Sequence, residues 1–317
     1  MKTLIAVAVL LLAGCGEKAN IPDDYPRGEG TKSGFHTQSQ TIKNTEAYVS
    51  YKDGYGAPVG PVEGTPIVFN GKLYTIIGNS HRGRSISSFR VDEVGVGLIA
   101  SVPAENFLYV SAVVHNGTVY VFGTINRTKI QVRTSTNLLD WSPVTDVYTS
   151  TNGEEIFNTS VTHNGTNFVM ALESRVAAVP NHFYVRFLTS DNLFSWALTP
   201  AIYSGIEFKN CPTIIYHNGY YYMLYMTWKV DAMMTFITRS TDLYSWDDAN
   251  YDPDGWTVPF TPSAGEGNNI SDVDLVEHNG SVFFLFTRGN QVSWLEMGSA
   301  TFAGTLNEYL SSFWPTP

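Results

Sequence analysis

Carboxylate side chains stand close to the ends of apolar runs at three places in this sequence. Glu63 and Asp272 each lie seven residues before an Asn-Gly pair, and Glu173 ends the apolar run that follows another such pair. A carboxylic acid and a carboxylate held close together can donate and accept a proton, which is general acid–base chemistry. An acid at the end of an apolar strand is also expected to have a raised pKa, which suits a proton donor. We therefore take Glu63, Asp272 and Glu173 as candidate catalytic residues.

Five Asn-Gly pairs, each between runs of β-branched and aromatic residues, indicate the elements that must position these acids. The pairs begin at Asn70, Asn116, Asn164, Asn218 and Asn279, with spacings of 46, 48, 54 and 61 residues. Asn-Gly between alternating apolar residues is a strong hairpin signal, because both residues tolerate the positive φ of a type I′ turn. A repeat of this length is typical of the four-stranded blades of a β-propeller. We expect an all-β fold, a five-bladed β-propeller over residues 46–317.

Two further patterns support this architecture. The segments STNLLDW, SDNLFSW and STDLYSW end at Trp141, Trp196 and Trp246. We interpret each as a turn capped by its Ser, Asp or Asn side chains, followed by a Trp packed between neighbouring blades. Thr305 and Glu308 form a Thr-x-x-Glu capping box, which predicts a short helix near the C-terminus.

The first fifteen residues have the pattern of a processing signal. Lys2 is followed by an apolar stretch from Leu4 to Leu12 and then by Leu-Ala-Gly-Cys, which ends at Cys15. The apolar stretch is far shorter than the roughly 20 residues that a membrane-spanning helix needs. Leu-Ala-Gly-Cys resembles the bacterial lipobox, which implies that Cys15 becomes a lipidated N-terminus. Gly16 in the next position implies an outer-membrane destination in the cell envelope.

Residues 16–45 are polar and rich in Gly, Lys, Thr, Gln and Asn, so we expect a flexible tether between the lipid anchor and the propeller. The sequence holds only two cysteines, Cys15 and Cys211. If Cys15 is lipidated, no intrachain disulfide is expected.

Composition narrows the choice of partners. Hydrophobic residues make up 43% of the chain and aromatic residues 14%, which is enough for a substantial core. The formal net charge is −10 with no long basic cluster, which disfavours nucleic acid and anionic membrane surfaces and favours a neutral ligand. We expect a monomer without a cofactor. The hairpin His residues recur at one repeat position, so they belong to the blade pattern rather than to a metal cluster, and nothing in the sequence supports a structural calcium ion in the tunnel. These His residues are His115, His163, His217 and His278.

The repeats resemble those of the five-bladed β-propeller glycoside hydrolases of the family 43, 32 and 68 type, over roughly residues 60–315. The turn formed by Ser240, Asp242, Leu243 and Trp246 is common in them. The run Asn210-Cys211-Pro212-Thr213 before YHNGYYYMLY looks like their Glu-Gly-Pro strand leading into a Tyr-rich hairpin. The resemblance implies an envelope protein that acts on an oligo- or polysaccharide by acid–base catalysis, with carbohydrate as its partner.

In family 43, a base Asp opens the innermost strand of the first blade, a second Asp tunes the pKa, and a Glu is the general acid. Glu63 occupies the position of the base. The second blade has Ser111 near the position of the tuning Asp, and the fourth has Asn210 at the position of the acid. The alternative function is therefore a non-catalytic propeller that binds a glycan or a partner, and a purely structural envelope scaffold is a third.

Counting back seven residues from each hairpin Asn defines a ring of positions, and residues just after each second strand should converge on the same mouth of the tunnel. The ring is Glu63, Tyr109, Phe157, Cys211 and Asp272. Amides and carboxylates can bind sugar hydroxyls, and an indole can stack on a sugar ring. We expect substrate binding by Asn158, Asn210, Asp274, His81, Trp228, Arg288 and Asn290.

Each candidate also has a plainer interpretation. Glu63 could be a solvated turn residue, and Glu173 could pair with Arg175 or Arg186 as a structural ion pair. Asp272 and Asp274 could bind backbone N–H groups and close the ring, and Trp228 could pack between blades.

Overall fold

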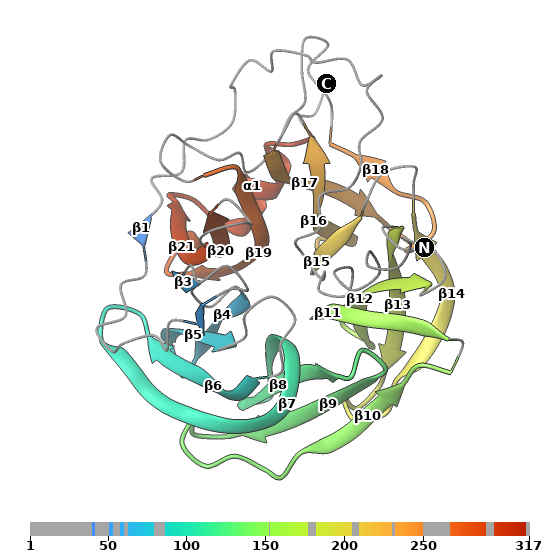
Figure 1. Cartoon of the computed structure of the whole chain (residues 1–317). Coiled ribbons are helices and arrows are strands. Elements are labelled where there is room, and N and C mark those ends of the chain that lie inside the picture. The colour runs from blue at the N-terminus through green and yellow to red at the C-terminus, as the bar shows by residue number, and fades with distance from the viewer. Residues whose placement is uncertain are drawn as a thin grey trace, which may run out of the picture.

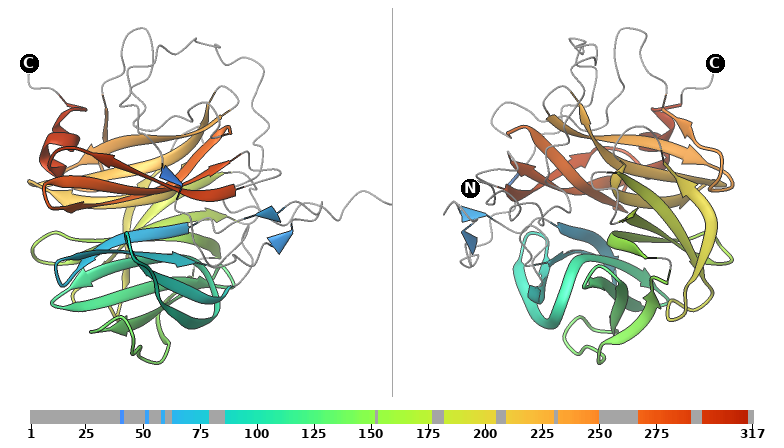
Figure 2. Two further views of the ribbon diagram at one scale, coloured as in Figure 1. Left: turned by 90° about the vertical axis from the view of Figure 1, so that its left-hand side faces the viewer. Right: turned by 45° about the vertical axis from the view of Figure 1, so that its right-hand side comes forward.

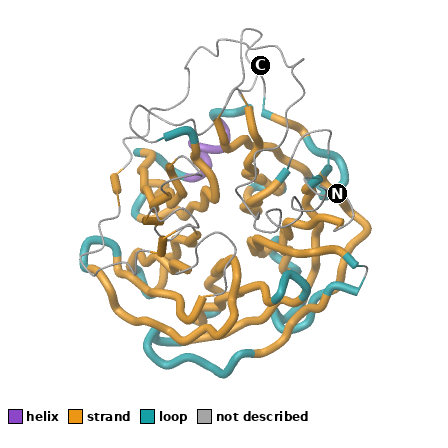
Figure 3. The backbone as a smooth tube through the Cα atoms, in the orientation of Figure 1, coloured by secondary structure: helices purple, strands orange, loops and turns teal. Residues whose placement is uncertain are grey.

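The computed structural model describes most of the repeat region. The described residues are 63–78, 86–151, 153–176, 182–204, 209–229, 232–249, 267–289 and 295–314, with three two-residue strands at 40–41, 51–52 and 58–59. The processing signal and nearly all of the predicted tether lie outside them. Strands dominate the described chain, and Figure 3 shows one helix beside them.

The strands form antiparallel blades arranged around a central axis (Figure 1). Blade 1 contains β4 (Glu63–Phe69), β5 (Lys72–Gly78), β6 (Ile86–Glu93) and the first part of β7 (Gly97–His115). Blade 2 contains the second part of β7 with β8 (Thr118–Ile125), β9 (Lys129–Ser135) and β10 (Thr145–Thr149). Blade 3 contains β11 (Glu154–His163), β12 (Phe168–Val176), β13 (Phe183–Ser190) and β14 (Ala197–Tyr203).

Blades 4 and 5 complete the ring. Blade 4 contains β15 (Asn210–His217), β16 (Tyr220–Lys229), β17 (Ala232–Ser240) and β18 (Asp247–Asp248). Blade 5 contains β19 (Asn269–His278), β20 (Ser281–Gly289), β21 (Leu295–Phe302) and β1 (Gln40–Thr41). β2 (Tyr51–Lys52) and β3 (Pro58–Val59) pair separately. The predicted five-bladed β-propeller is confirmed.

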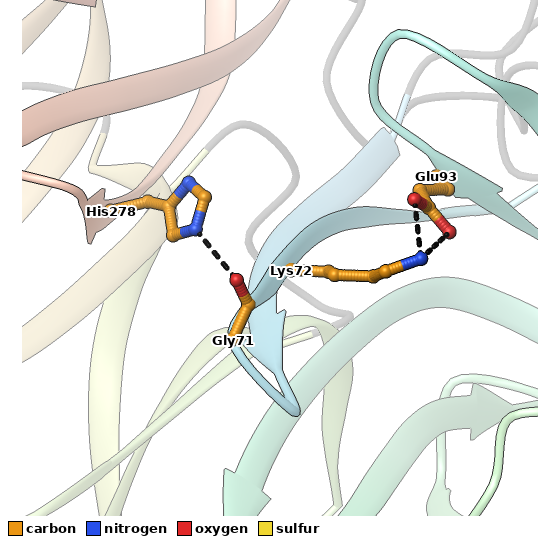
Figure 4. A network of polar contacts seen from close by, with 4 residues as sticks. All are labelled: Gly71, Lys72, Glu93 and His278. Atoms are coloured by element: carbon orange, nitrogen blue, oxygen red, sulfur yellow. Dashed lines mark hydrogen bonds and ion pairs between the residues drawn. The ribbon is translucent and has the colours of Figure 1, made fainter.

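The ring is joined where its first and last blades meet. β1 pairs antiparallel with β21, so a segment that precedes blade 1 in the chain supplies the outer strand of blade 5. This pairing extends the propeller to residues before the predicted boundary at 46. At the hairpins, the His278 ring lies 3.1 Å from the Gly71 carbonyl oxygen, and the neighbouring Lys72 pairs with Glu93 at 2.9 Å (Figure 4).

Four of the five predicted hairpins have the expected turn. Asn and Gly both have positive φ at Asn70, Asn116, Asn218 and Asn279 and at the glycines that follow them. The third hairpin differs. His163 pairs with Phe168, so four residues form its loop, and the Asn164 side chain accepts from the N–H groups of Thr166 and Asn167. Asn164 thus stabilises an Asx-type turn rather than a type I′ turn.

The Trp turns form as predicted. In blade 4, Ser240 Oγ accepts from the N–H of Leu243 at 2.9 Å, and Trp246 Nε1 donates to the Leu243 carbonyl at 3.0 Å. The Trp246 ring then stacks on Phe187 of blade 3 with a centroid distance of 5.5 Å. The other two copies make the same bonds, and their rings contact the preceding blade: Trp141 meets Phe89, and Trp196 meets Phe122. The core therefore lies between blades, where each Trp fills the interface.

The predicted capping box starts helix α1 (Leu306–Ser311), since the side chains of Thr305 and Glu308 bond to each other's backbone N–H groups. The Leu306 N–H donates to Glu277, and Asn218 of the blade 4 hairpin donates to Asn307. α1 therefore covers the hairpin face of blades 4 and 5, whereas β2 and β3 lie at the opposite face (Figure 2). Among the described residues no helix is long and apolar enough to cross a membrane.

Candidate active site

A β-bulge recurs in the innermost strands at the position seven residues before the hairpin Asn. The register shifts between Leu108 and Ser111, Ile156 and Thr159, Asn210 and Thr213, and Ser271 and Asp274. Tyr109, Cys211 and Asp272 have left-handed backbones with φ of 54°, 47° and 51°. A bulge of this kind re-aims one side chain out of the strand's regular alternation. The positions seven residues before each hairpin Asn therefore coincide with β-bulges in blades 2 to 5. In blade 1, β4 pairs regularly.

The amide of Asn158 joins the carboxylates of Glu63 and Asp272. Its Nδ2 donates to Asp272 Oδ1 at 2.9 Å, and its side chain also hydrogen-bonds to Glu63. The two carboxylates are also close enough for the charge of Asp272 to raise the pKa of Glu63. The Val110 backbone donates to Glu63, and Ser271 Oγ donates to Asp272 Oδ2 at 2.6 Å. Residues of blades 1, 3 and 5 therefore meet at one point.

Glu173 reaches the same point from β12 and is fully buried. Its Oε2 accepts from the Cys211 N–H of blade 4 at 2.9 Å. The ion pairs considered for it are made by other acids, because Arg175 pairs with Glu155 at 2.6 Å and Arg186 pairs with Glu154 at 3.2 Å.

Burial raises the pKa values of all three acids. The pKa of Glu63 rises well above its usual value because of burial and then because of the nearby Asp272 and Glu173. Burial raises the pKa of Asp272 to about 7, although the Ser271 and Asn158 bonds oppose the change. Burial raises the pKa of Glu173 to about 8, partly offset by the Cys211 N–H. Near neutral pH, Glu173 is therefore chiefly a neutral acid, and Asp272 is the acid that ionises more readily.

Buried polar atoms without a hydrogen-bond partner gather around these acids. Within the part of the chain that the structure describes, they are Glu63 Oε2, the Tyr109 hydroxyl, Asn158 Oδ1, Glu173 Oε1 and both amide atoms of Asn210. Such an atom costs about 1–3 kcal/mol when nothing satisfies it. Native proteins concentrate them where a ligand or water binds. The site is suited to a ligand with many hydroxyl groups.

Asp274, predicted to bind substrate, has protein partners in blades 5 and 1. Its Oδ1 accepts from the Leu275 N–H at 2.8 Å, and its carboxylate also hydrogen-bonds to the Thr65 side chain. Thr65 Oγ1 in turn accepts from the Ala112 N–H at 3.3 Å. These contacts link blades 5, 1 and 2, as in the ring-closing interpretation of Asp274. Burial raises the pKa of Asp274 to about 6.

For the remaining predicted site residues, the structure gives either a position on a strand or no description. Arg288 lies on β20 opposite Ile270, and Trp228 lies on β16 opposite Met233. His81, Asn290 and the lipidation site Cys15 lie outside the described residues. Cys211 is disulfide-bonded, contrary to the expectation of no intrachain disulfide, and its partner also lies outside them. No cluster of three or more potential metal ligands occurs among the described His, Cys, Asp and Glu residues.

One residue that was missed lies beside the acids. Arg127 follows β8, the second strand of blade 2, and its charge lowers the pKa of Glu173 against the larger effect of burial. The rule that selected Glu173, which takes residues just after a second strand, would also have selected Arg127.

Comparison with solved structures identifies the class of fold. The catalytic domain of a Coprinopsis cinerea GH62 α-L-arabinofuranosidase aligns at 12% identity over 83% of this chain and 95% of its own, with a TM-score of 0.58. A GH43 endo-arabinanase from Bacillus licheniformis aligns at 14% identity over 76% and 94%, with a TM-score of 0.51. The GH32 β-fructofuranosidase BmSUC1 of Bombyx mori aligns at 10% identity over 77% and 61%, with a TM-score of 0.52.

No protein-family model and no curated protein matches the chain. The class defined by the structure is therefore a β-propeller with the fold of GH43, GH32 and GH62 glycoside hydrolases. At these identities the likeness establishes the fold alone.

Proposed function

We propose that this protein is a glycoside hydrolase that cleaves an oligo- or polysaccharide by acid–base catalysis. The observation that carries the proposal is the meeting of Glu63, Asp272 and Glu173 from three different blades around the Asn158 amide. Hydrolysis of a glycosidic bond needs one carboxyl group that donates a proton and one that is ionised. The raised pKa values of the three acids suit this division of roles.

Glu173 serves as the general acid, because its pKa of about 8 keeps it protonated near neutral pH. Glu63 and Asp272 act together as the base. The charge of Asp272 raises the pKa of Glu63, so the pair carries at most one negative charge near neutral pH. Asn158 donates to both carboxylates and stabilises that charge whichever of them holds it.

The test is hydrolysis of plant and algal oligosaccharides by the wild type and by Glu63→Gln, Asp272→Asn and Glu173→Gln. Each substitution should lower kcat by about 100-fold or more, since general acid–base catalysis contributes a factor of that size. Asp191→Asn, at an exposed turn, is the matched control and should retain full activity. Equal turnover by the wild type and all three site variants would refute the assignment.

A second function is favoured by one observation. Asn210 stands where the resemblance implies the general acid, and Ser111 Oγ hydrogen-bonds to Thr159 Oγ1 at 2.7 Å where it implies a tuning acid. The chain could therefore bind a glycan without cleaving it. If the protein binds one of the oligosaccharides of the hydrolysis test but releases no product from any of them, this second function is supported instead.

We further propose that in the mature protein a lipid on Cys15, in place of the disulfide that the structure gives Cys211, tethers the protein to the cell envelope. The support is the lipobox-like run before Cys15 in the sequence. Mass spectrometry of the N-terminal peptide from native membranes should find a diacylglyceryl thioether on this sulfur. A peptide joined to Cys211 by a disulfide would contradict the proposal, because one sulfur cannot form both bonds.

A further inference from the structure

Two arginines beside the acids share one carboxylate. Arg175 Nε contacts Glu155 Oε2 at 2.6 Å, whereas Arg127 Nη1 is 3.7 Å from Glu155 Oε1, which is beyond hydrogen-bond distance. Both guanidinium groups lie 5.2 Å from the centre of the Phe157 ring. Both arginines form ion pairs with the single charge of Glu155, so these three side chains together carry one net positive charge, and the longer distance leaves Arg127 the less fully neutralised of the two.

Arg127 is also the more accessible of the two. Its side chain is 14% exposed, and that of Arg175 is 8% exposed. Arg175 is held further by the Phe183 ring, which lies 5.3 Å from its guanidinium. The Phe157 ring supports one side of the Arg127 guanidinium, whose charge also acts on the neighbouring Tyr109 hydroxyl.

The backbone at Arg127 is unusual for its residue type. Asn126 and Arg127 have φ of 50° and 57°, and the Thr128 N–H donates to the Ile125 carbonyl at 3.0 Å. In four of the Asn-Gly hairpins the second of two such residues is Gly, which adopts this conformation without strain. A side chain retained at a strained position points to a role for that side chain.

Arg127 lies close enough to the acids for its charge to act on the same group of residues. Its charge acts on both Glu173 and Tyr109, and the Tyr109 hydroxyl also responds to the charge of Glu63. Because the nearby acids hold their protons tightly, they repel an incoming anion less than their number implies. The formal net charge of −10 favours a neutral ligand for the chain as a whole. At this site, however, the two arginines outnumber the one carboxylate that pairs with them.

We propose that the glycan bound at this site carries a carboxylate, as a uronic acid does, and that Arg127 binds that carboxylate. This inference rests on the proposed function of the site in binding a glycan. A guanidinium presents two parallel N–H groups that match the two oxygens of a carboxylate. Arg127 is thereby a specificity-determining residue, and uronate-containing chains are the substrate class.

The test compares each acidic oligosaccharide with its own neutral form. Calorimetric titration of the purified protein would use oligogalacturonate, oligoglucuronate and alginate oligosaccharides, each beside its methyl-esterified counterpart. At least one acidic oligosaccharide should bind about ten-fold more tightly than its ester, since a charge-assisted hydrogen bond contributes an effect of that size. Equal binding of acid and ester, or no binding of any uronate, overturns the proposal.

Two variants separate recognition from folding. Arg127→Gln should lose the preference for the acid over the ester. Arg127→Gly should lose the same preference while its Tm stays equal or rises, because Gly relieves the left-handed backbone. Lys129→Gln removes one positive charge from the same blade, where Lys129 pairs with Asp146 at the surface, and should keep the preference. An unchanged preference in both Arg127 variants overturns the assignment.

The result is distinguishable from the outcome of the hydrolysis experiment. A protein that binds uronates and cleaves none contradicts the proposed hydrolase and leaves the role of Arg127 intact. A protein that cleaves neutral oligosaccharides and shows no preference for uronates supports the proposed hydrolase and contradicts the role of Arg127. A sulfated galactan that contains no uronate is included because sulfate also binds guanidinium groups. Binding of that galactan alone would contradict the assignment to a carboxylate.

Discussion

Asn158 Nδ2 lies 2.9 Å from Asp272 Oδ1, so an amide of blade 3 hydrogen-bonds to a carboxylate of blade 5. The two residues are 114 positions apart in the chain, and the blade between them in sequence contributes Cys211 to the same site. The same amide also bonds to Glu63 of blade 1. A single neutral donor therefore fixes the relative position of two acids that repel each other when both are ionised.

Replacement of Asn158 by Ala should shift the acid limb of the pH–activity profile to higher pH. The amide stabilises the ionised carboxylates, so its loss raises the pKa of Asp272 above about 7 and raises that of Glu63 further. We expect a shift of about 1 pH unit, since one hydrogen bond to a charged group is worth about 1.5–3 kcal/mol divided over two acids. The measurement is kcat/KM from pH 4 to pH 9 with one oligosaccharide.

Asn307→Ala, at the helix on the hairpin face, is the control and should leave the profile unchanged. A lower kcat in Asn158→Ala with an unshifted profile would contradict the role in holding the charge. It would indicate that Asn158 contacts the substrate instead.

The hairpin repeat was sufficient to predict which residues form the ring. Each Asn-Gly turn fixes the register of its strand pair, so a fixed number of residues before the turn reaches the same level of every blade. Glu63, Tyr109 and Asp272 were selected in this way, and they act on one another in the structure. Glu173 followed from its place at the end of the apolar run of a second strand, although β12 continues for three residues beyond it.

What the repeat could not predict depends on contacts between blades. Asp272 and Asp274 are two residues apart and equivalent by pattern, but the bulge between them separates their partners, and Asp274 bonds to Thr65. No pattern within one blade encodes such a partner. The third hairpin also departs from its copies, because Thr166 and Asn167 lengthen the loop and the Asn164 side chain bonds to their backbone instead.

The Trp turns should contribute measurably to stability. Ser190 Oγ accepts from the N–H groups of Asn192 and Leu193, so Ser190→Ala leaves two donors without their acceptor. We expect a loss of about 1–2 kcal/mol in the free energy of unfolding, as for other capping side chains. Urea unfolding gives the value, and Ser195→Ala at an exposed position of the same turn should change it by less than about 0.5 kcal/mol.

Thr65→Val should separate ring closure from substrate binding. The Thr65 hydroxyl bonds to Asp274 and accepts from Ala112, so its removal leaves a buried carboxylate with fewer partners. We expect a loss of about 1–3 kcal/mol in unfolding free energy with unchanged oligosaccharide affinity. Thr145→Val, on the exposed outer strand of blade 2, is the control. Unchanged stability with weakened affinity would return Asp274 to the substrate site.

Glu173→Gln should stabilise the protein at alkaline pH and have little effect in acid. The pKa of Glu173 rises from 4.5 to about 8 in the folded protein. Below pH 4.5 the acid is protonated in both the folded and unfolded states, so its ionisation costs the folded state nothing. As pH rises towards 8 the unfolded chain releases the proton more readily, and stability falls by this linkage. Gln carries no proton to release and keeps an oxygen for the Cys211 N–H.

Above pH 8 we therefore expect Glu173→Gln to exceed the wild type by on the order of 2–4 kcal/mol in unfolding free energy. Urea unfolding at pH 4.5 and pH 8.5 measures the difference, and Asp191→Asn, at an exposed turn, should show none. The variant should be inactive at both pH values if Glu173 is the general acid. If the variant is more stable but inactive, then Glu173 is a buried acid that is retained for its chemistry although it lowers the stability of the fold. Equal stability of variant and wild type at pH 8.5 would mean that Glu173 ionises normally and cannot hold its proton for catalysis.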